Sequence, residues 1–385
     1  MELDSLLAEM VERKASDLHL VAGVPPVFRV DGYLAPGQDP AYKPIDRPLQ
    51  EGQDLPEDAA QRLSNRKGLL PPWENQHPNL TTDDVNALLQ SALPEGKLNA
   101  AWEGRDFSAT LRHDDEIFRC QVFRSGGSLA AAIRILPKRI PTLDEMHLPP
   151  IFEKLTQLRR GLVLVVGPTG SGKTTTVVSM LEQINMTHSA RIYTLEDPLN
   201  YVLKTKLSLV TQRVVGEDVE SYESGLLSIK DADPDVVFIG EMRTPEVVRL
   251  AAEIAESGTL VFSQMTADTA AEAIERLINL LGEPHGTARR LIARTFQAVI
   301  AQKLLVRADR QGRVAANEIL LSTAQTRRMI SDGQTAPELL ELVMSASRSL
   351  GMQTMDDALL NHYAEGVISR ETAAEHLRDK SRLPG

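Results

Sequence analysis

The sequence has little of what a secreted, membrane-spanning or nucleic-acid-binding protein needs. Its single cysteine, Cys120, excludes an internal disulfide, which fits a reducing compartment. No apolar run approaches the ~20 residues that span a bilayer, and the acidic, amphipathic start does not resemble a secretion signal. The net charge of -11 argues against a nucleic-acid partner, because such proteins usually carry a basic face. We therefore expect a cytoplasmic protein without direct membrane insertion.

One motif near the middle of the chain indicates nucleotide binding. Residues 167–174 read GPTGSGKT and fit the pattern G-x-x-x-x-G-K-[ST], after an apolar run at 162–166 and before a helical pattern. In such a loop the backbone wraps around the β-phosphate, Lys173 reaches the β- and γ-phosphates, and the Thr174 hydroxyl coordinates Mg²⁺. The predicted nucleotide-binding residues are Gly167, Pro168, Thr169, Gly170, Ser171, Gly172, Lys173, Thr174 and Thr175.

Strands and helices alternate from residue 151 onward, which predicts an α/β domain built on a mostly parallel sheet. Glu241 follows the apolar strand in DPDVVFIGEMR, and Glu196 ends the strand in RIYTLE. Because ligands bind at the carboxyl ends of such strands, both are candidate catalytic acids, and Glu241 is also a candidate Mg²⁺ ligand through water. Glu241 could instead be a solvated glutamate at a strand end, and Glu196, together with Asp197, could instead cap the loop that begins at Pro198. From about residue 285 the pattern predicts mainly helices.

The chain divides into regions of different character. We expect an N-terminal domain at residues 1–138, a linker at 139–150 and a nucleotide-binding domain at 151–385. Residues 36–79 are rich in proline and polar residues, which predicts a long loop or a disordered insertion. Its LLPPW string, ending at Trp73, could dock a partner. We favour a tolerated surface insertion, because loops absorb extra length at little cost.

Eight strings along the chain are distinctive in combination: ASDLHLVAGVPPVFRVDG, RGLVLVVGPTGSGKTTT, TLEDPLNYV, TQRVVG, DPDVVFIGEMR, AAEIAESGTLVF, GRVAANEILL and GMQTMDDAL. Through them the sequence resembles the secretion ATPases, and specifically the type IV pilus retraction ATPases of the PilT and PilU group. The resemblance covers nearly the whole chain apart from residues 36–79.

This resemblance implies a PAS-like α+β N-terminal domain and a RecA-like P-loop ATPase domain with a helical C-terminal region. It implies a homohexameric ring that binds ATP and Mg²⁺ at the inner face of the cytoplasmic membrane. There such rings turn a membrane platform protein, so that the pilus retracts and the cell moves by twitching. It further implies that Glu241 and Thr174 hold the metal, and that Arg119 and Arg134 of the N-terminal domain approach the phosphates.

Several positions depart from the family pattern. Asn200 stands where the acidic box of the family has a second glutamate, and Thr266 and Thr259 stand where it has two histidines. An asparagine cannot accept a proton near neutral pH, and a threonine is shorter and less basic than a histidine. Losing one acid–base participant typically slows a reaction by ~10²–10⁴. We therefore predict retained ATP binding with slow turnover.

Two functions stay open at this point. The protein could be a retraction motor in its own right, with the arginines of a neighbouring subunit completing the site, or a nucleotide-binding accessory subunit in a mixed ring with a competent paralogue. A small-molecule kinase or GTPase has little support, and the sequence lacks the guanine-binding motif N-K-x-D. It also lacks L-S-G-G-Q, the signature of the transporter ATPases. The pilus extension ATPases usually carry a four-cysteine zinc site, which one cysteine cannot build.

Overall fold

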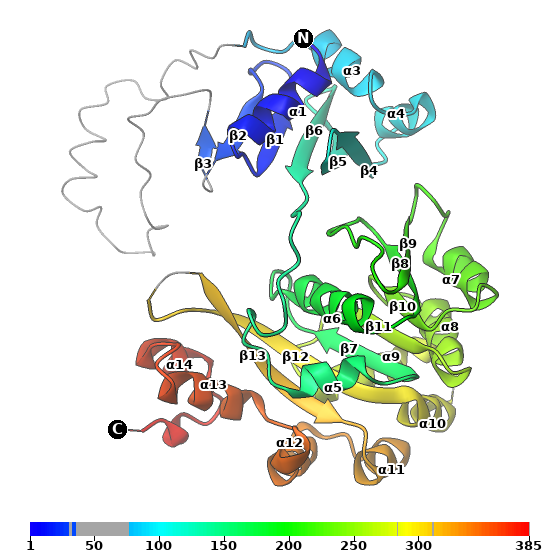
Figure 1. Cartoon of the computed structure of the whole chain (residues 1–385), viewed down its shortest axis with the longest axis vertical. Coiled ribbons are helices and arrows are strands. Elements are labelled where there is room, and N and C mark those ends of the chain that lie inside the picture. Colours follow the sequence, from blue (N-terminus) through cyan, green and yellow to red (C-terminus); the bar gives the residue numbers. More distant parts are fainter. Residues whose placement is uncertain (31–32, 36–76, 283, 310–311, 385) are drawn as a thin grey trace. The chain divides into compact units, whose positions relative to one another are not determined.

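The computed structural model describes residues 1–30, 33–35, 77–282, 284–309 and 312–384. The chain forms two compact units, Met1–Pro137 and Lys138–Gly385 (Figure 1). Between the last strand of the first unit and the first helix of the second, residues 136–150 form neither helix nor strand. The predicted insertion at 36–79, with its Trp73 string, lies outside the described residues except for 77–79.

The described residues of the N-terminal unit form a six-stranded sheet with three helices on one face. Its strands pair antiparallel in the order β3-β2-β1-β6-β5-β4. The strands are β1 (Asp17–Leu20), β2 (Val27–Val30), β3 (Tyr33–Ala35), β4 (Phe107–His113), β5 (Glu116–Ser125) and β6 (Ser128–Ile135), and the helices are α1 (Leu3–Glu12), α3 (Thr82–Gln90) and α4 (Glu95–Trp102).

Alternation along β5 shows why this sheet buries one face. Phe118, Cys120 and Val122 point into the core, and the residues between them are only partly buried. Leu6 and Met10 of α1 lie in the same core, at a spacing that suits one face of a helix.

The C-terminal unit contains a seven-stranded sheet in the order β13-β12-β7-β11-β10-β8-β9. All neighbouring pairs are parallel except β12 with β13. The strands are β7 (Gly161–Val166), β8 (Arg191–Glu196), β9 (Leu209–Val214), β10 (Val236–Ile239), β11 (Leu260–Met265), β12 (Phe296–Val306) and β13 (Arg313–Leu321). The helices are α5 (Ile151–Thr156), α6 (Lys173–Thr187), α7 (Tyr222–Lys230), α8 (Pro245–Glu256), α9 (Ala270–Leu281), α10 (His285–Thr295), α11 (Ala324–Asp332), α12 (Pro337–Ala346), α13 (Met355–Ala364) and α14 (Arg370–His376).

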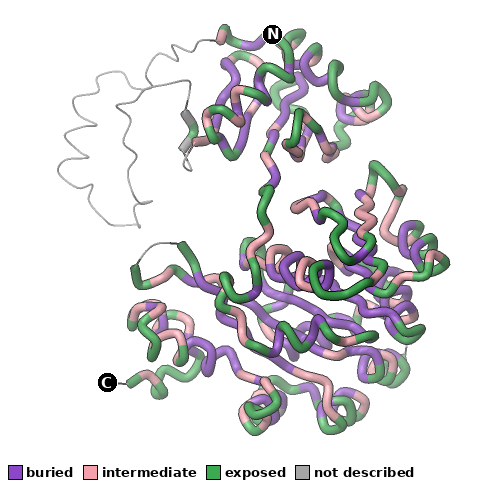
Figure 2. The backbone as a smooth tube through the Cα atoms, viewed as in Figure 1, coloured by how far each residue is buried: buried purple, intermediate pink, exposed green. Residues whose placement is uncertain are grey.

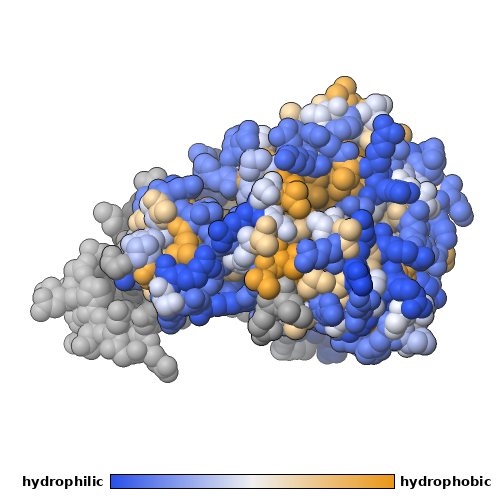
Figure 3. Space-filling view, turned by 90° about the horizontal axis from the view of Figure 1, so that it is seen from below, coloured by the Kyte–Doolittle hydropathy of each residue, from blue (hydrophilic) through white to orange (hydrophobic). Residues whose placement is uncertain are grey.

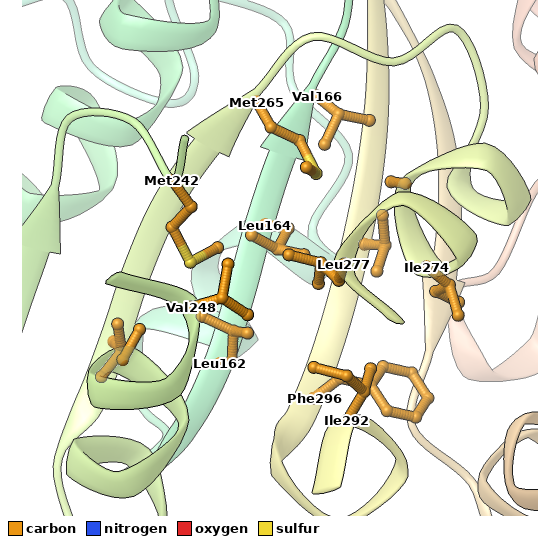
Figure 4. Packing of buried hydrophobic residues seen from close by; sticks show 14 of the residues in the cluster. Leu162, Leu164, Val166, Met242, Val248, Met265, Ile274, Leu277, Ile292 and Phe296 are labelled. Carbon is orange, nitrogen blue, oxygen red and sulfur yellow. The ribbon is translucent and has the colours of Figure 1, made fainter. Parts of the chain in front are cut away.

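Helices cover both faces of this sheet, so its central strands are buried throughout (Figure 2). Leu164 of β7 packs in a core with α8 and α9, where Figure 4 shows it near Val248 and Leu277. Val163 and Val165, which point the other way, pack with α5 and α6. A strand covered on both sides needs an unbroken apolar run, which is what precedes the glycine-rich loop.

Residue types that favour helix ends cap two helices of this unit. The Thr244 hydroxyl accepts a hydrogen bond from the Val247 backbone at the start of α8, and Pro245 occupies its first turn. Gly282 ends α9 in the left-handed conformation.

The region after residue 285 is mainly helical, as predicted, but it includes two long strands that the sequence analysis missed. β12 has buried residues on both faces, so its apolar run shows neither a clear period of two nor one of 3.6. β12 pairs with β7, which is distant in the sequence, and with β13, which follows it directly in the chain.

No helix among the described residues is both long and apolar enough to cross a lipid bilayer. The face drawn in Figure 3 is mostly hydrophilic, with hydrophobic groups gathered in small areas.

Candidate functional site

The strand order brings four polar features to one edge of the C-terminal sheet. β7, β11, β10 and β8 are consecutive parallel neighbours, so their carboxyl ends meet. The glycine-rich loop follows β7, Gln264 lies near the end of β11, Glu241 follows β10, and Glu196 ends β8. The structure thus places the predicted loop, Glu196 and Glu241 at the same edge of the sheet. Gln264, which was not predicted, lies there too.

The loop requires glycine for steric reasons. A Cβ atom on Gly167 would lie 2.3 Å from the Gln302 carbonyl oxygen, so no side chain fits there. Gly172 has a φ of +84° and precedes the first residue of α6, Lys173. The free N–H groups and the dipole at this helix start favour an anion.

The side chain of Gln302 in β12 is hydrogen-bonded to the loop and to α6. Its side-chain nitrogen donates to the Ser171 carbonyl oxygen at 2.6 Å, and its side-chain oxygen accepts from the Thr176 hydroxyl at 2.8 Å. The residue is 1% exposed. The sequence analysis missed it because it lies in the strand that was not predicted. A polar residue inside the run AVIAQKLLV was the available signal.

The Lys173 ammonium lies against the loop. It donates to the carbonyl oxygens of Gly167 and Pro168, both at 2.8 Å. Burial lowers the pKa of Lys173, and the nearby Glu241 carboxylate opposes that shift. Neutral carbonyls are weaker partners than phosphate oxygens, so this ammonium can turn to a phosphate without losing a strong ion pair.

The hydroxyls of Ser171, Thr174 and Thr175 have different surroundings. The Thr174 hydroxyl donates to the Gln264 side-chain oxygen at 3.1 Å, and the Thr175 hydroxyl lies 3.0 Å from that of Tyr201. The Ser171 hydroxyl is buried and has no hydrogen-bond partner in the described part of the chain. The predicted loop residues Pro168, Thr169 and Gly170 are exposed.

Glu241 lies at the edge in partial contact with solvent. Its carboxylate accepts a hydrogen bond from Arg243 at 2.6 Å, and its side chain is 34% exposed. A Cβ atom on the preceding residue, Gly240, would lie 2.8 Å from the Tyr222 hydroxyl, so a side chain there would force Tyr222 to move. Arg243 and Tyr222 were not predicted as site residues. Arg243 follows Glu241 by two positions, whereas nothing in the local sequence identifies Tyr222.

Glu196 is deeply buried, at 2% exposure. One carboxylate oxygen accepts from the Thr194 hydroxyl at 2.8 Å and from the Gln212 amide at 3.2 Å, and the other has no partner among the described residues. Burial raises the pKa of Glu196 to about 7. A carboxyl with this pKa can take up and release a proton near neutral pH, as a general base must.

Asn200, Thr266 and Thr259, which are expected to depart from the family pattern, lie in different places. The Asn200 amide donates to the Pro198 carbonyl oxygen at 2.9 Å, close to Glu196 in the chain. Thr266 is exposed immediately after β11, at the same edge as Gln264. Thr259 precedes β11, so it lies at the opposite end of the strand. Within one chain, the substitution at Thr259 therefore does not bear on this edge.

Arg119 and Arg134, the remaining predicted residues, are neighbours on β5 and β6 of the N-terminal unit. The Arg134 side chain donates to Asp17 at 2.7 Å. Burial alone would raise the pKa of Asp17, but hydrogen bonds from Arg134 and Ser16 outweigh it and lower the pKa. Burial lowers the pKa of Arg119. These side chains belong to a different unit from the sheet edge.

The residues at the sheet edge fit Mg²⁺ when phosphates are also present. Within the described ranges, no group of three or more His, Cys, Asp and Glu residues could hold a metal ion unaided. Mg²⁺ is usually bound by one or two protein oxygens together with phosphates and water. The Thr174 hydroxyl and the Glu241 carboxylate supply oxygens of this kind, and the buried Ser171 hydroxyl leaves a polar group for a phosphate.

Comparison with known proteins gives consistent matches. A family model described as "Type II/IV secretion system protein" matches residues 130–374. The chain is 33% identical to the type IV pilus retraction ATPase PilT of Pseudomonas aeruginosa, over 100% of this chain and 99% of that protein. It is 32% identical to the type IV pilus ATPase PilU of the same organism, over 98% and 88%. A crystal structure of the pilus retraction motor PilT with bound ADP superposes with a TM-score of 0.79, at 35% identity, over 100% and 99% of the two chains.

Proposed function

We propose that this chain, which belongs to the type II/IV secretion system protein family and within it to the type IV pilus retraction ATPases of the PilT and PilU group, binds Mg²⁺-ATP at residues 167–175 and hydrolyses it slowly. The observation that carries the proposal is the sheet edge itself. An ordered phosphate loop lies beside two acids there, whereas Asn200 and Thr266 replace residues of the family pattern at the same edge.

Each group has a distinct task in this proposal. The loop backbone and Lys173 hold the phosphates, and Thr174 and Glu241 hold Mg²⁺, which when bound neutralises charge on the phosphates. Glu241 orients the attacking water. Glu196, with a pKa of about 7, takes up a proton within the acidic box. Asn200 can hydrogen-bond water but cannot accept its proton, which is the physical reason for slow turnover.

The assembly that we propose is a homohexameric ring, or a mixed ring with a paralogue, at the inner face of the cytoplasmic membrane. In it, Arg119 and Arg134 of a neighbouring subunit approach the phosphates, and the ring acts on an inner-membrane platform protein to retract the pilus and drive twitching motility. The sheet unit at residues 1–138 would be the PAS-like domain and residues 139–150 its linker. Both relatives from P. aeruginosa are named as pilus ATPases, which supports this role.

A second candidate is an accessory subunit that binds ATP without appreciable turnover. Asn200 and Thr266 favour it, because both changes remove groups that can exchange protons near neutral pH. The two candidates differ in one measurable quantity, the rate at which the isolated protein releases phosphate.

The test is phosphate release by the purified full chain with Mg²⁺-ATP, beside calorimetric ATP binding. Lys173→Ala removes the phosphate contact, and Lys154→Ala, at an exposed position on α5, is the matched control. Turnover above that of Lys173→Ala supports a slow motor, and equal rates with ATP still bound by the parent support the accessory subunit. Absence of ATP binding by the parent contradicts both.

A further inference from the structure

Gln264 links the phosphate loop to the segment that carries Glu241. Its side-chain oxygen accepts the Thr174 hydroxyl at 3.1 Å, and its backbone oxygen accepts the N–H of Met242 at 3.3 Å. Met242 directly follows Glu241 in the chain. Because β11 lies between β7 and β10, this one residue is in contact with both sides of the site.

The amide of Gln264 is unusual for its position. All six residues of β11 are buried, and Gln264 is 6% exposed. A buried polar group costs free energy unless it has a partner, so an apolar residue would serve packing alone at least as well. Ser263, the other polar residue of the strand, bonds to the Ile239 carbonyl within the sheet. The side chain of Gln264 instead bonds to the loop.

The direction of this hydrogen bond determines what Thr174 can do. A hydroxyl has one proton and two lone pairs. By donating its proton to Gln264, the Thr174 hydroxyl leaves its lone pairs free for a cation. Without an acceptor behind it, the hydroxyl can turn its proton toward the cation or toward another oxygen. Residues that orient a metal ligand in this way affect metal affinity although they never touch the metal.

We propose that Gln264 is a positioning residue for Mg²⁺: it orients the Thr174 hydroxyl as a metal ligand and ties that ligand to the Glu241 segment. This proposal rests on the proposed binding of a nucleotide with Mg²⁺ at the loop. At the carboxyl end of β11, the residue that acts on the metal site is then Gln264. It lies two residues before Thr266, the position at which the family pattern has a histidine.

The test is calorimetric binding of ADP to the full chain, once with excess Mg²⁺ and once with a chelator, so that hydrolysis plays no part. Gln264→Met keeps the length of the side chain and removes the acceptor, whereas Gln264→Glu keeps an acceptor oxygen. We expect Mg²⁺ to tighten ADP binding to the parent. The gain should fall about tenfold or more in Gln264→Met and be retained in Gln264→Glu, while the affinity without Mg²⁺ stays within about twofold.

The outcomes separate this proposal from the proposed function. If Mg²⁺ tightens ADP binding to Gln264→Met as much as it does for the parent, the proposed role of Gln264 is wrong. The role is also wrong if Gln264→Met loses the same affinity for ADP with Mg²⁺ and with the chelator, and melts at a lower temperature. The same holds if Mg²⁺ gives the parent no gain although ADP binds. If the parent binds no nucleotide in either arm, the proposed function itself fails. Should Gln264→Met not fold, Gln264→Asn removes the contact by shortening the side chain and is expected to show the same lost gain.

Discussion

Replacing Glu196 with glutamine should stabilise the protein, and the gain should grow with pH. The ordinary pKa of 4.5 rises to about 7 in the folded protein, which corresponds to about 3 kcal/mol. Below about pH 4.5 the carboxyl is protonated in both states and costs nothing. Between the two values the unfolded chain releases a proton that the folded chain keeps, so stability falls. Above about pH 7 the whole penalty is present.

Glutamine imitates the protonated acid at this site. Its oxygen can accept from Thr194 and Gln212, as the Glu196 oxygen does. Its amide nitrogen occupies the place of the unpartnered oxygen, so any cost there is the same at every pH. The stability difference between Glu196→Gln and the parent should therefore increase by about 2–3 kcal/mol from pH 5 to pH 8.

The assay is urea unfolding of the full chain without nucleotide, followed by circular dichroism at several pH values. Asp197→Asn is the matched control, because it removes a carboxylate from the next, exposed position. The stability difference from the parent should change more with pH for Glu196→Gln than for this control. A Glu196→Gln difference that stays constant between pH 5 and pH 8 would show that burial does not perturb this carboxyl as described.

Three further results are expected. Phosphate release by the parent should rise with pH through about 7, because Glu196 must be ionised to accept a proton, and Glu196→Gln should lack that rise in a pH–rate series. Gln302→Leu should lower the free energy of unfolding in urea by about 2–6 kcal/mol, because the buried Ser171 carbonyl and Thr176 hydroxyl lose their partner. A decrease below about 1 kcal/mol would contradict this. Gly240→Ala should lower the melting temperature, because the added methyl group would be too close to the Tyr222 hydroxyl, and adding Tyr222→Phe should restore part of the lost melting temperature. No recovery would mean that the backbone around Gly240 cannot accept a methyl group.

The parts of the fold that depend on local sequence were predictable. The unbroken apolar run at 162–166 lies in β7, and the alternation of strands and helices from residue 151 onward corresponds to the α/β unit with its mostly parallel sheet. The resemblance to the pilus retraction ATPases and the α/β fold are confirmed by the relatives and by the PilT structure. β12 and β13 were missed because both faces of each strand are largely buried, so no period of two marks them as strands.

The site was predictable where a motif fixes a role and not where tertiary packing does. Lys173, Thr174 and Glu241 were identified from their spacing to predicted strands. The contacts of Gln264 and Gln302 with the loop were not, because each depends on the strand order of the sheet. The pKa of Glu196 is likewise a property of its burial, which its neighbours in the chain do not determine.

We propose that this chain holds ATP firmly but cleaves it slowly, because water activation is weakened. In a single-turnover experiment, excess protein is mixed with labelled ATP and Mg²⁺, and bound ADP is followed with time. We predict that ATP is bound and cleaved slowly, and that Asn200→Glu combined with Thr266→His accelerates cleavage at least ~10-fold. Rapid cleavage by the parent, or bound ATP that the restored variant cleaves no faster, would contradict the claim.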